Sequence, residues 1–532
     1  MKKTYFLLLG LFLLTLISSC SEVNDWPVDK GCDRLFRPLQ FEISKTTANS
    51  VTITFSYVPK AARYVFEFSE DSLKFDNITK SVTILADTLT TFAESTDIIK
   101  TSYRTIFDDL KGSTKYSVRM KAISADGKES GYLEDLFTTP DEQIFTDCKA
   151  SVNTVLLEWK AGTKVTNINY WETGQADSIV TTHQVTDEEM QAGKAVIDGL
   201  ASGTRYTAII YNGNSKRGSK KFTTLGMKDG KEYTVQPDDD VNAILVKYAS
   251  EGTSALTLEF PAGTYEIGKL TIPIGITDLY IAGNVTAKAN MPELFIPQVS
   301  LSGEISTLTF QNINLNARKD GANYLFDIKD TNCFGSLTFE GCRIRNINRS
   351  LIRFNTRNLE IEKIKINDCV VEDVATGGYG FINTPKNAQK NINIFSITNS
   401  TMINIGSDFM LQINKGWNTI VIDKCTFYNN CGCKGLFRFD AAPTSVSVTN
   451  TIFSGINNGN EFNAGSKSYD YLDFNSCYKT NDVKVGKNKF KNIEDIPYSS
   501  EDFFMAPADG DFHIKTGISF AGLEKAGDPR WY

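Results

Sequence analysis

Polar side chains occupy one position of a short apolar pattern that recurs through the C-terminal half of the chain. Each copy places a polar residue among apolar ones, as in Leu351-Ile-Arg-Phe354 and Leu436-Phe-Arg-Phe439. If the copies stack as strands, these polar residues align on one outward face, because successive side chains of a strand alternate between its two faces. The aligned set, here called the polar ladder, is Asp327, Arg353, Asn383, Gln412 and Arg438.

The polar ladder has the chemistry of a carbohydrate-binding surface. Amide side chains both donate and accept hydrogen bonds, and an arginine fork can bind a uronate carboxylate through two parallel bonds. We therefore expect the polar ladder to bind an extended sugar chain. Two positions further along, the same copies carry more candidates, with a break at Pro385. These are Lys329, Asn355, Asn414 and Asp440.

Three aromatic residues lie near the expected strand ends and could stack on pyranose rings: Tyr324, Tyr379 and Trp417. A plainer interpretation stands beside this one. The exterior of any repetitive fold must be polar somewhere, and a ladder of polar residues then follows from the repeat alone. Each named residue therefore has a surface role as its alternative to a binding role.

Base-catalysed cleavage of an acidic glycan is the alternative chemistry for this region. A polysaccharide lyase needs a basic side chain near a carboxylate that a cation such as calcium neutralises. Arg353 or Arg438 would be the base, with Asp327, Asp440 or Glu372 at the cation. However, the Arg-x-Pro-x-x-Arg string of one pectate-lyase family and the Gly-His-Gly string of polygalacturonase-type hydrolases are absent. We expect a binding protein without a cofactor, and keep a divergent lyase as the alternative.

Histidine and cysteine usage argues against other catalytic classes. The chain has only two histidines, His183 and His513, which is too few for a His-rich metal site and unfavourable for a Ser-His-Asp triad. Cys431 and Cys433 are two residues apart in an expected turn, but no histidine supports them as metal ligands. We therefore expect no metal site. Arg343 and Arg345 add charge to the neighbouring strand copies.

The elements that must position these residues recur from Leu308-Thr-Phe-Gln-Asn-Ile-Asn-Leu315 to Leu472-Asp-Phe-Asn-Ser-Cys-Tyr478. The start-to-start spacings are 29, 27, 31, 25, 26 and 26 residues, which is typical of a solenoid. Within each copy we expect the first, third and sixth residues to point inward and the fifth to make a bend. The sixth position forms a buried small-residue column, whose cysteines we expect to be free thiols. These are Cys342, Cys369, Cys425 and Cys477.

Further strings resemble a known family. Leu256-Thr-Leu-Glu-Phe-Pro-Ala-Gly-Thr-Tyr-Glu-Ile267 and Leu279-Tyr-Ile-Ala-Gly283 resemble the start of pectin-lyase-like β-helices. Gly527-Asp-Pro-Arg-Trp531 resembles the tail of pectate-lyase-like modules of unknown function that end many polysaccharide-utilisation lipoproteins. The resemblance implies a right-handed parallel β-helix over residues 240–532 and fixes no activity.

Two segments upstream of the repeats resemble fibronectin type III domains. Alternating strings such as Val51-Thr-Ile-Thr-Phe55 and Val155-Leu-Leu-Glu-Trp159 predict half-buried strands. The family's corner motif, Leu-x-x-Gly-Thr-x-Tyr or close to it, appears at Leu110–Tyr116 and Leu200–Tyr206. Each tyrosine can pack its ring in the core and bond a backbone group near the turn. We expect sandwiches at 36–140 and 141–226, acting mainly as spacers.

The N-terminus predicts export and lipidation. Lys2 and Lys3 precede an apolar run that is too short for a comfortable membrane span. Leu16-Ile17-Ser18-Ser19-Cys20 resembles the cleavage box of bacterial lipoproteins, which implies removal of residues 1–19, acylation of Cys20 and a tether over 20–35. The alternative is an ordinary cleaved signal peptide. Attached acyl chains would partner the protein with a lipid membrane.

Composition bounds the remaining functions. The 532 residues carry a net charge of -7, which argues against nucleic acid as a partner. Scarce helical patterns and abundant β-forming residues predict an all-β chain of two fibronectin type III-like sandwiches followed by a right-handed parallel β-helix. We expect an outer-membrane lipoprotein, displayed at the cell surface, that binds an acidic or plant-type polysaccharide beside components of a glycan transporter. A structural adhesin or spacer is the third hypothesis.

Overall fold

A computed structural model describes most of the chain after the predicted tether. The predicted lipidation site Cys20, the ladder neighbour Asn414 and the pair Cys431 and Cys433 lie outside the described residues. The described ranges are 34–93, 101–174, 179–284, 291–318, 323–329, 332–355, 358–384, 389–406, 408–413, 417–429, 434–455, 459–472, 474–488 and 490–532.

The chain forms two compact units, each described here by itself. The first unit holds the first sandwich, whose core packs Phe55 against Tyr64 and Phe66. One sheet has the order β1 (Phe41–Thr46), β2 (Val51–Ser56), β6 (Ser102–Phe107), β5 (Thr91–Ala93). The other has the order β4 (Ile78–Leu85), β3 (Ala61–Ser69), β7 (Lys115–Ser124), β8 (Leu133–Thr138).

The second sandwich also consists of two antiparallel sheets, and it carries the short helix α2 (Asp187–Ala192), which the sequence analysis did not predict. Thr186 and Glu189 close a capping box at the start of this helix. One sheet has the order β13 (Lys194–Ile197), β10 (Val155–Trp159), β9 (Phe145–Ala150). The other has the order β12 (Thr181–Gln184), β11 (Asn167–Glu172), β14 (Arg205–Asn212), β15 (Ser215–Thr223).

The predicted tyrosine corners are confirmed in both sandwiches. Tyr116 is buried, and its hydroxyl accepts a hydrogen bond from the Lys111 amide at 3.0 Å. Tyr206 does the same with the Ala201 amide, also at 3.0 Å. Each ring therefore fills the core while its polar tip satisfies the turn. Trp159 also lies in the core of its sandwich.

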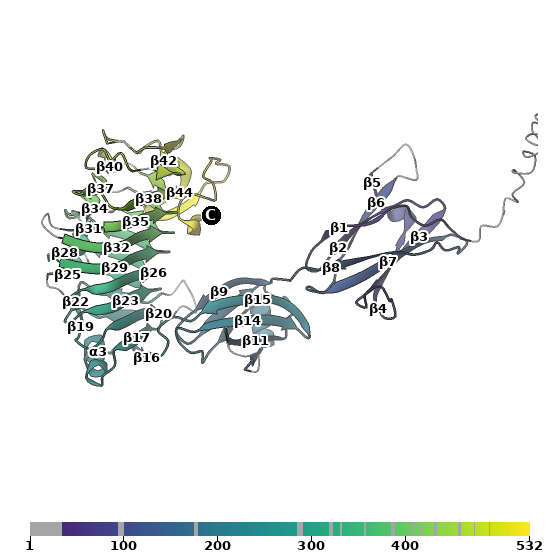
Figure 1. The fold of residues 1–532 in the computed structure, drawn as a ribbon, viewed down its shortest axis with the longest axis horizontal. Helices are drawn as coiled ribbons and strands as arrows, with labels where there is room; N and C mark the ends of the chain where they lie inside the picture. The colour runs from purple at the N-terminus through teal and green to yellow at the C-terminus, as the bar shows by residue number, and fades with distance from the viewer. Residues whose placement is uncertain are drawn as a thin grey trace, which may run out of the picture. The chain divides into compact units, whose positions relative to one another are not determined.

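The C-terminal half is a coil of three parallel sheets, so the predicted parallel β-helix is confirmed (Figure 1). Sheet one comprises β16 (Lys231–Thr234), β17 (Ala255–Phe260), β20 (Asp278–Gly283), β23 (Ile305–Gln311), β26 (Phe334–Glu340), β29 (Asn358–Asn367), β32 (Gln389–Thr398), β35 (Trp417–Asp423), β38 (Ser445–Thr449) and β41 (Phe474–Asn475). Its first strand, β16, precedes the expected start at residue 240.

The other two sheets complete each turn of the coil. Sheet two comprises β18 (Thr264–Glu266), β21 (Glu293–Phe295), β24 (Asn314–Asn316), β27 (Arg343–Ile347), β30 (Val370–Val374), β33 (Thr401–Ile403), β36 (Thr426–Tyr428), β39 (Ile452–Ser454), β42 (Cys477–Thr480) and β43 (Ile493–Ile496). Sheet three comprises β19 (Leu270–Ile272), β22 (Val299–Leu301), β25 (Tyr324–Ile328), β28 (Ser350–Phe354), β31 (Ile382–Asn383), β34 (Phe409–Ile413), β37 (Gly435–Phe439) and β40 (Asn463–Gly465).

The repeat's inward and bend positions behave as predicted. The cysteines of the sixth position are buried thiols that form no disulfide, and burial raises the pKa of the Cys369 and Cys425 thiols. The fifth position adopts a left-handed backbone conformation in successive coils, which turns the chain from sheet one into sheet two. Residues with this conformation are Asn312, Gly341, Asp368, Asn399, Lys424, Asn450 and Ser476.

Additional elements cover the start of the coil and the outer face of sheet two. Helix α3 (Val241–Ser250) buries Val241 and Leu245 against the first coils, and the Asp240 side chain caps its N-terminus (Figure 1). A C-terminal segment packs on the outer face of sheet two around Ile452, Phe503 and Phe512. Its elements are α4 (Ser500–Phe503), β44 (Phe504–Ala506), β45 (Asp511–Ile514) and the short 3-10 turn Pro529–Trp531. Among the described residues, no helix is long and apolar enough to span a membrane.

Candidate functional site

Sheet three brings the five residues of the polar ladder into register. The Cα partners are Asp327 with Arg353, Arg353 with Asn383, Asn383 with Gln412, and Gln412 with Arg438. In β28, Ile352 and Phe354 point inward and are fully buried, so the residue between them faces outward. Five strands about 4.8 Å apart give a row roughly 19 Å long. The assignment of this row to sugar binding stays a prediction.

The first two residues of the polar ladder are bonded to each other. Arg353 donates from Nε and Nη2 to the two carboxylate oxygens of Asp327, both at 2.7 Å. Its Nη1 donates to the Tyr324 hydroxyl at 3.2 Å, and its guanidinium lies 4.0 Å from the Tyr324 ring centroid. Lys329 lies 3.2 Å from the same carboxylate. The arginine fork is therefore already occupied by a protein carboxylate.

Electrostatics at this pair oppose the catalytic alternative. Burial acts to raise the pKa of Asp327, but its hydrogen bonds to Arg353 and Lys329 outweigh burial and lower it. The bond to Asp327 in turn raises the pKa of Arg353. A general base must be deprotonated near the working pH before it can accept a proton. Arg353 is held in its protonated form and therefore cannot take that role.

One aromatic ring beside this pair is open to solvent. Tyr379 is 40% exposed and has a φ of 110°, which is unusual for a residue with a bulky side chain. Its ring centroid lies 6.1 Å from that of Tyr324, and the Arg349 guanidinium lies 5.2 Å from it. Tyr324 itself is only 7% exposed. Of these two tyrosines, Tyr379 presents the surface for stacking.

The prediction that Trp417 contacts a sugar is wrong. Trp417 begins β35 in sheet one and is 3% exposed. Its register partner in the preceding coil is the buried Ile392, and its ring packs 5.4 Å from that of Phe395. The tryptophan therefore occupies an inward column that earlier coils fill with isoleucine or phenylalanine. The strand starts earlier than the repeat pattern indicated, and this explains the error.

At the C-terminal end of the polar ladder, here called the open end, side chains are available to a ligand. Gln412 and Arg438 are half-buried, and within the described residues neither side chain has a hydrogen-bond or ion-pair partner. Asn383, between the two ends, is 6% exposed. Asn355 and Asp440 lie just past their strands and are exposed. The groups available to a ligand therefore concentrate around Gln412 and Arg438.

A cavity of about 430 Å³ lies next to this open end. Ser466 lines this cavity, and its backbone N–H donates a hydrogen bond to the carbonyl of Phe437, the residue before Arg438. The cavity therefore adjoins the polar ladder. Pockets of this size are typical of small-ligand sites. The lining residues are Phe409, Lys434, Asn460, Glu461, Asn463, Gly465, Ser466, Lys487 and Asn488.

Hydrogen bonds hold part of this lining in place. The Asn463 amide donates to the Lys434 carbonyl and accepts from the Asn488 backbone. Lys434 lies 3.4 Å from Asp408. Position 435 must be glycine for the Phe409 ring to pack against it. A Cβ at this position would lie 3.2 Å from the ring and closer still to the Asn463 carbonyl. Sequence reasoning missed this group because the Asn463–Gly465 strand departs from the repeated pattern.

Glu372, the third residue of the catalytic alternative, lies on a different sheet. It is on β30 in sheet two, where it pairs with Arg343 at 2.6 Å, while Arg345 pairs with Glu293 at 2.6 Å. Arg353 and Arg438 are three strands apart in sheet three, or roughly 14 Å. Arg353, Arg438 and Glu372 are therefore not assembled into one site, and the carboxylate beside Arg353 is that of Asp327. Among the described residues, no group of three or more His, Cys, Asp or Glu is placed to hold a metal ion.

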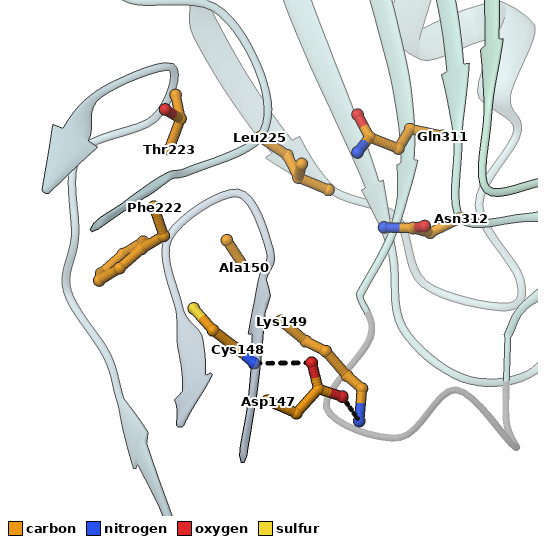
Figure 2. Close-up of a pocket in the computed structure, with 9 residues that line it drawn as sticks. All are labelled: Asp147, Cys148, Lys149, Ala150, Phe222, Thr223, Leu225, Gln311 and Asn312. Atoms are coloured by element: carbon orange, nitrogen blue, oxygen red, sulfur yellow. Dashed lines mark hydrogen bonds and ion pairs between the residues drawn. The ribbon is translucent and has the colours of Figure 1, made fainter. Parts of the chain in front are cut away.

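A smaller cavity of about 290 Å³ includes Cys148 (Figure 2). Its charged lining is satisfied, since the Asp147 carboxylate accepts from the Cys148 amide and lies 2.9 Å from the Lys149 ammonium. Burial raises the pKa of the Cys148 thiol to about 11, so the thiol stays protonated and weakly nucleophilic. This cavity lacks the reactive groups of an active site.

Comparisons with known proteins bear on parts of the chain. A domain of unknown function, DUF5123, matches residues 420–531. A two-domain fibronectin type III segment of chicken tenascin aligns at 16% identity over 35% of this chain and 99% of its own, with a TM-score of 0.22. Domains FN1–FN3 of chicken CNTN1 align at 18% identity over 36% of this chain and 68% of their own, with a TM-score of 0.16. No curated protein matches the sequence.

Proposed function

We propose that this chain is a cell-surface lipoprotein that binds a polysaccharide along sheet three of its β-helix. The observation that carries the proposal is the open end of the polar ladder. There, Gln412 and Arg438 offer hydrogen-bonding groups that have no partner within the described part of the chain, beside a cavity lined largely by polar residues. An extended row about 19 Å long suits a polymer better than a single small molecule. The DUF5123 match adds no activity to this argument.

Acidic polysaccharides are the favoured ligand class. A guanidinium without a protein partner can bind a carboxylate as a charge-assisted fork, and Arg438 is such a group among the described residues. The adjacent cavity is lined by Lys434 and Lys487 but also by Glu461, and Lys434 is paired with Asp408, so the cavity adds little net charge to that of Arg438. The lipid on Cys20 would hold the protein on the outer membrane, where transporter components could receive the glycan. The sandwiches between the two would act as spacers.

The structural adhesin and the lyase remain the competing hypotheses. A row closed off by loops would favour the adhesin, but Arg353, Gln412 and Arg438 keep exposed surface. A lyase would need a base that can give up its proton, but the bond to Asp327 raises the pKa of Arg353, and Glu372 lies on a different sheet from both arginines. Binding without turnover is therefore the function that the geometry supports best.

A glycan panel tests the proposal and separates the three hypotheses. Pectic, other acidic and neutral polysaccharides would be titrated against the full chain while ultraviolet absorbance follows any unsaturated uronide product. We expect binding to an acidic polymer and no product. Product formation would support the lyase, and a failure to bind any glycan would support the adhesin.

A further inference from the structure

The end of the first sandwich at which the described chain begins exposes two large apolar side chains. Phe36 is 78% exposed and Leu39 is 74% exposed. Both lie in the segment that leads into β1. Phe36 is the most exposed large apolar side chain among the described residues, and such a side chain gains from contact with an apolar phase because its exposure to water is unfavourable.

Basic side chains lie beside Phe36. Arg34, Lys60 and Lys128 line a cavity of about 450 Å³ together with Phe36, and Arg37 is exposed within the same segment. Asp126 is the acidic residue of that lining. Its carboxylate accepts a bond from the Ser124 hydroxyl and lies 3.9 Å from the Lys128 ammonium. This end of the sandwich is therefore locally basic on a chain whose net charge is -7.

The position of this patch in the chain indicates its partner. Residues 21–33 separate the predicted acylation site Cys20 from Arg34. A chain of that length spans at most about 50 Å. Attachment at Cys20 therefore keeps the patch close to the bilayer, where even a weak contact forms at a high effective concentration.

We propose that this end of the first sandwich rests on the membrane surface. Phe36 and Leu39 insert among the lipid headgroups, as exposed aromatic and aliphatic side chains do at membrane interfaces. Arg34, Arg37, Lys60 and Lys128 pair with anionic headgroups. The inference rests on the lipid anchor of the proposed function and is independent of glycan binding.

Tryptophan quenching in vesicles tests this proposal. The acylated full chain would be placed on phosphatidylglycerol-containing vesicles whose phosphatidylcholine carries brominated acyl chains, and flotation would confirm attachment. F36W is the reporter, read as the difference from the unsubstituted protein. I106W is the matched control, because Ile106 is 61% exposed on the same sandwich. In β6, Ser102 pairs with Ser56, which precedes the Pro59–Lys60 turn at the patch. Ile106 lies near the opposite end of β6 and therefore away from the patch.

We expect the tryptophan at position 36 to lose at least half its emission and the one at position 106 to keep its emission. Combining F36W with K60E and K128E should restore the emission, because the charge attraction is then reversed. Unquenched F36W in protein that floats with the vesicles would overturn the membrane contact while leaving the anchor intact. Equal quenching at both positions would also overturn it. Protein that does not float would overturn the anchor and this inference together, without bearing on glycan binding.

Discussion

The two arginines of the polar ladder occupy equivalent positions but have different roles. Arg353 is fixed by Asp327 and Tyr324, whereas Arg438 has no partner among the described residues. Sequence spacing makes the two residues indistinguishable, because both stand between inward-facing apolar neighbours. The carboxylate one coil earlier decides which arginine is structural. Asp327 precedes Arg353, and Gln412 precedes Arg438.

We predict that R353A destabilises the β-helix. It leaves the Asp327 carboxylate, whose side chain is 6% exposed, without its main partner. Breaking a buried pair costs about 3–5 kcal/mol, and this pair should lie toward the lower figure because Arg353 is 23% exposed. Urea unfolding measures the loss. The double variant D327N/R353A should recover much of it, and a loss below about 1 kcal/mol in R353A would refute the structural role.

We also predict a pH effect from Asp528, which is 1% exposed and accepts a 2.7 Å bond from the Thr401 hydroxyl. Burial raises its pKa to about 6, despite the nearby Arg530. The folded state therefore holds this proton more tightly than the unfolded chain does. The resulting stability is present below the unfolded value of 3.8 and is lost as pH rises through about 6.

The variant D528N removes this titration while keeping the shape of the side chain. Between about pH 4 and 7, the stability of the unsubstituted protein should fall relative to D528N by up to about 3 kcal/mol. Unfolding curves of the two proteins across this range measure the change. A difference that stays constant with pH would show that Asp528 does not titrate there.

Among the secondary-structure elements, most strands of the β-helix could be predicted from the sequence repeat. Its inward positions, bends and buried cysteines follow from a pattern that each coil repeats, so the register of sheet three could be predicted without coordinates. The exceptions arise where one coil departs from the others. Trp417 replaces the isoleucine or phenylalanine of earlier coils in an inward column, and the Asn463–Gly465 strand lacks the apolar pattern. Helix α3 was also missed, because one short helix leaves little periodic signal.

The bend column offers a test at this scale. Lys424 is exposed and has a φ of 53°, whereas asparagine fills the equivalent position at residues 312, 399 and 450. Asparagine tolerates the left-handed region better than other side chains that carry a Cβ. We predict that K424V destabilises the protein by about 1–2 kcal/mol, while K424N is neutral or slightly stabilising. Thermal unfolding compares them, and equal stability of both variants would contradict the assigned strain.

The whole molecule combines two fibronectin type III-like sandwiches and a β-helix, for which a lipid anchor and a polysaccharide ligand are proposed. Sequence motifs predicted both sandwiches and the coil, because strand alternation and corner tyrosines are local features. They could not predict which polar residues are satisfied, since that depends on neighbours about 26 to 30 residues away along the chain. Nor could they reveal the cavity beside Ser466, whose lining comes from four separated segments.

The central claim is that the open end of the polar ladder binds an acidic polysaccharide. The most direct test is the affinity of the full chain, R438A and R343A for the best polymer of the glycan panel. Arg343 is the matched control, because it is an exposed arginine on sheet two that pairs with Glu372. We expect R438A to weaken binding by about 1–3 kcal/mol without changing unfolding, and R343A to bind normally. Unchanged affinity in R438A, or equal losses in both variants, would contradict the claim.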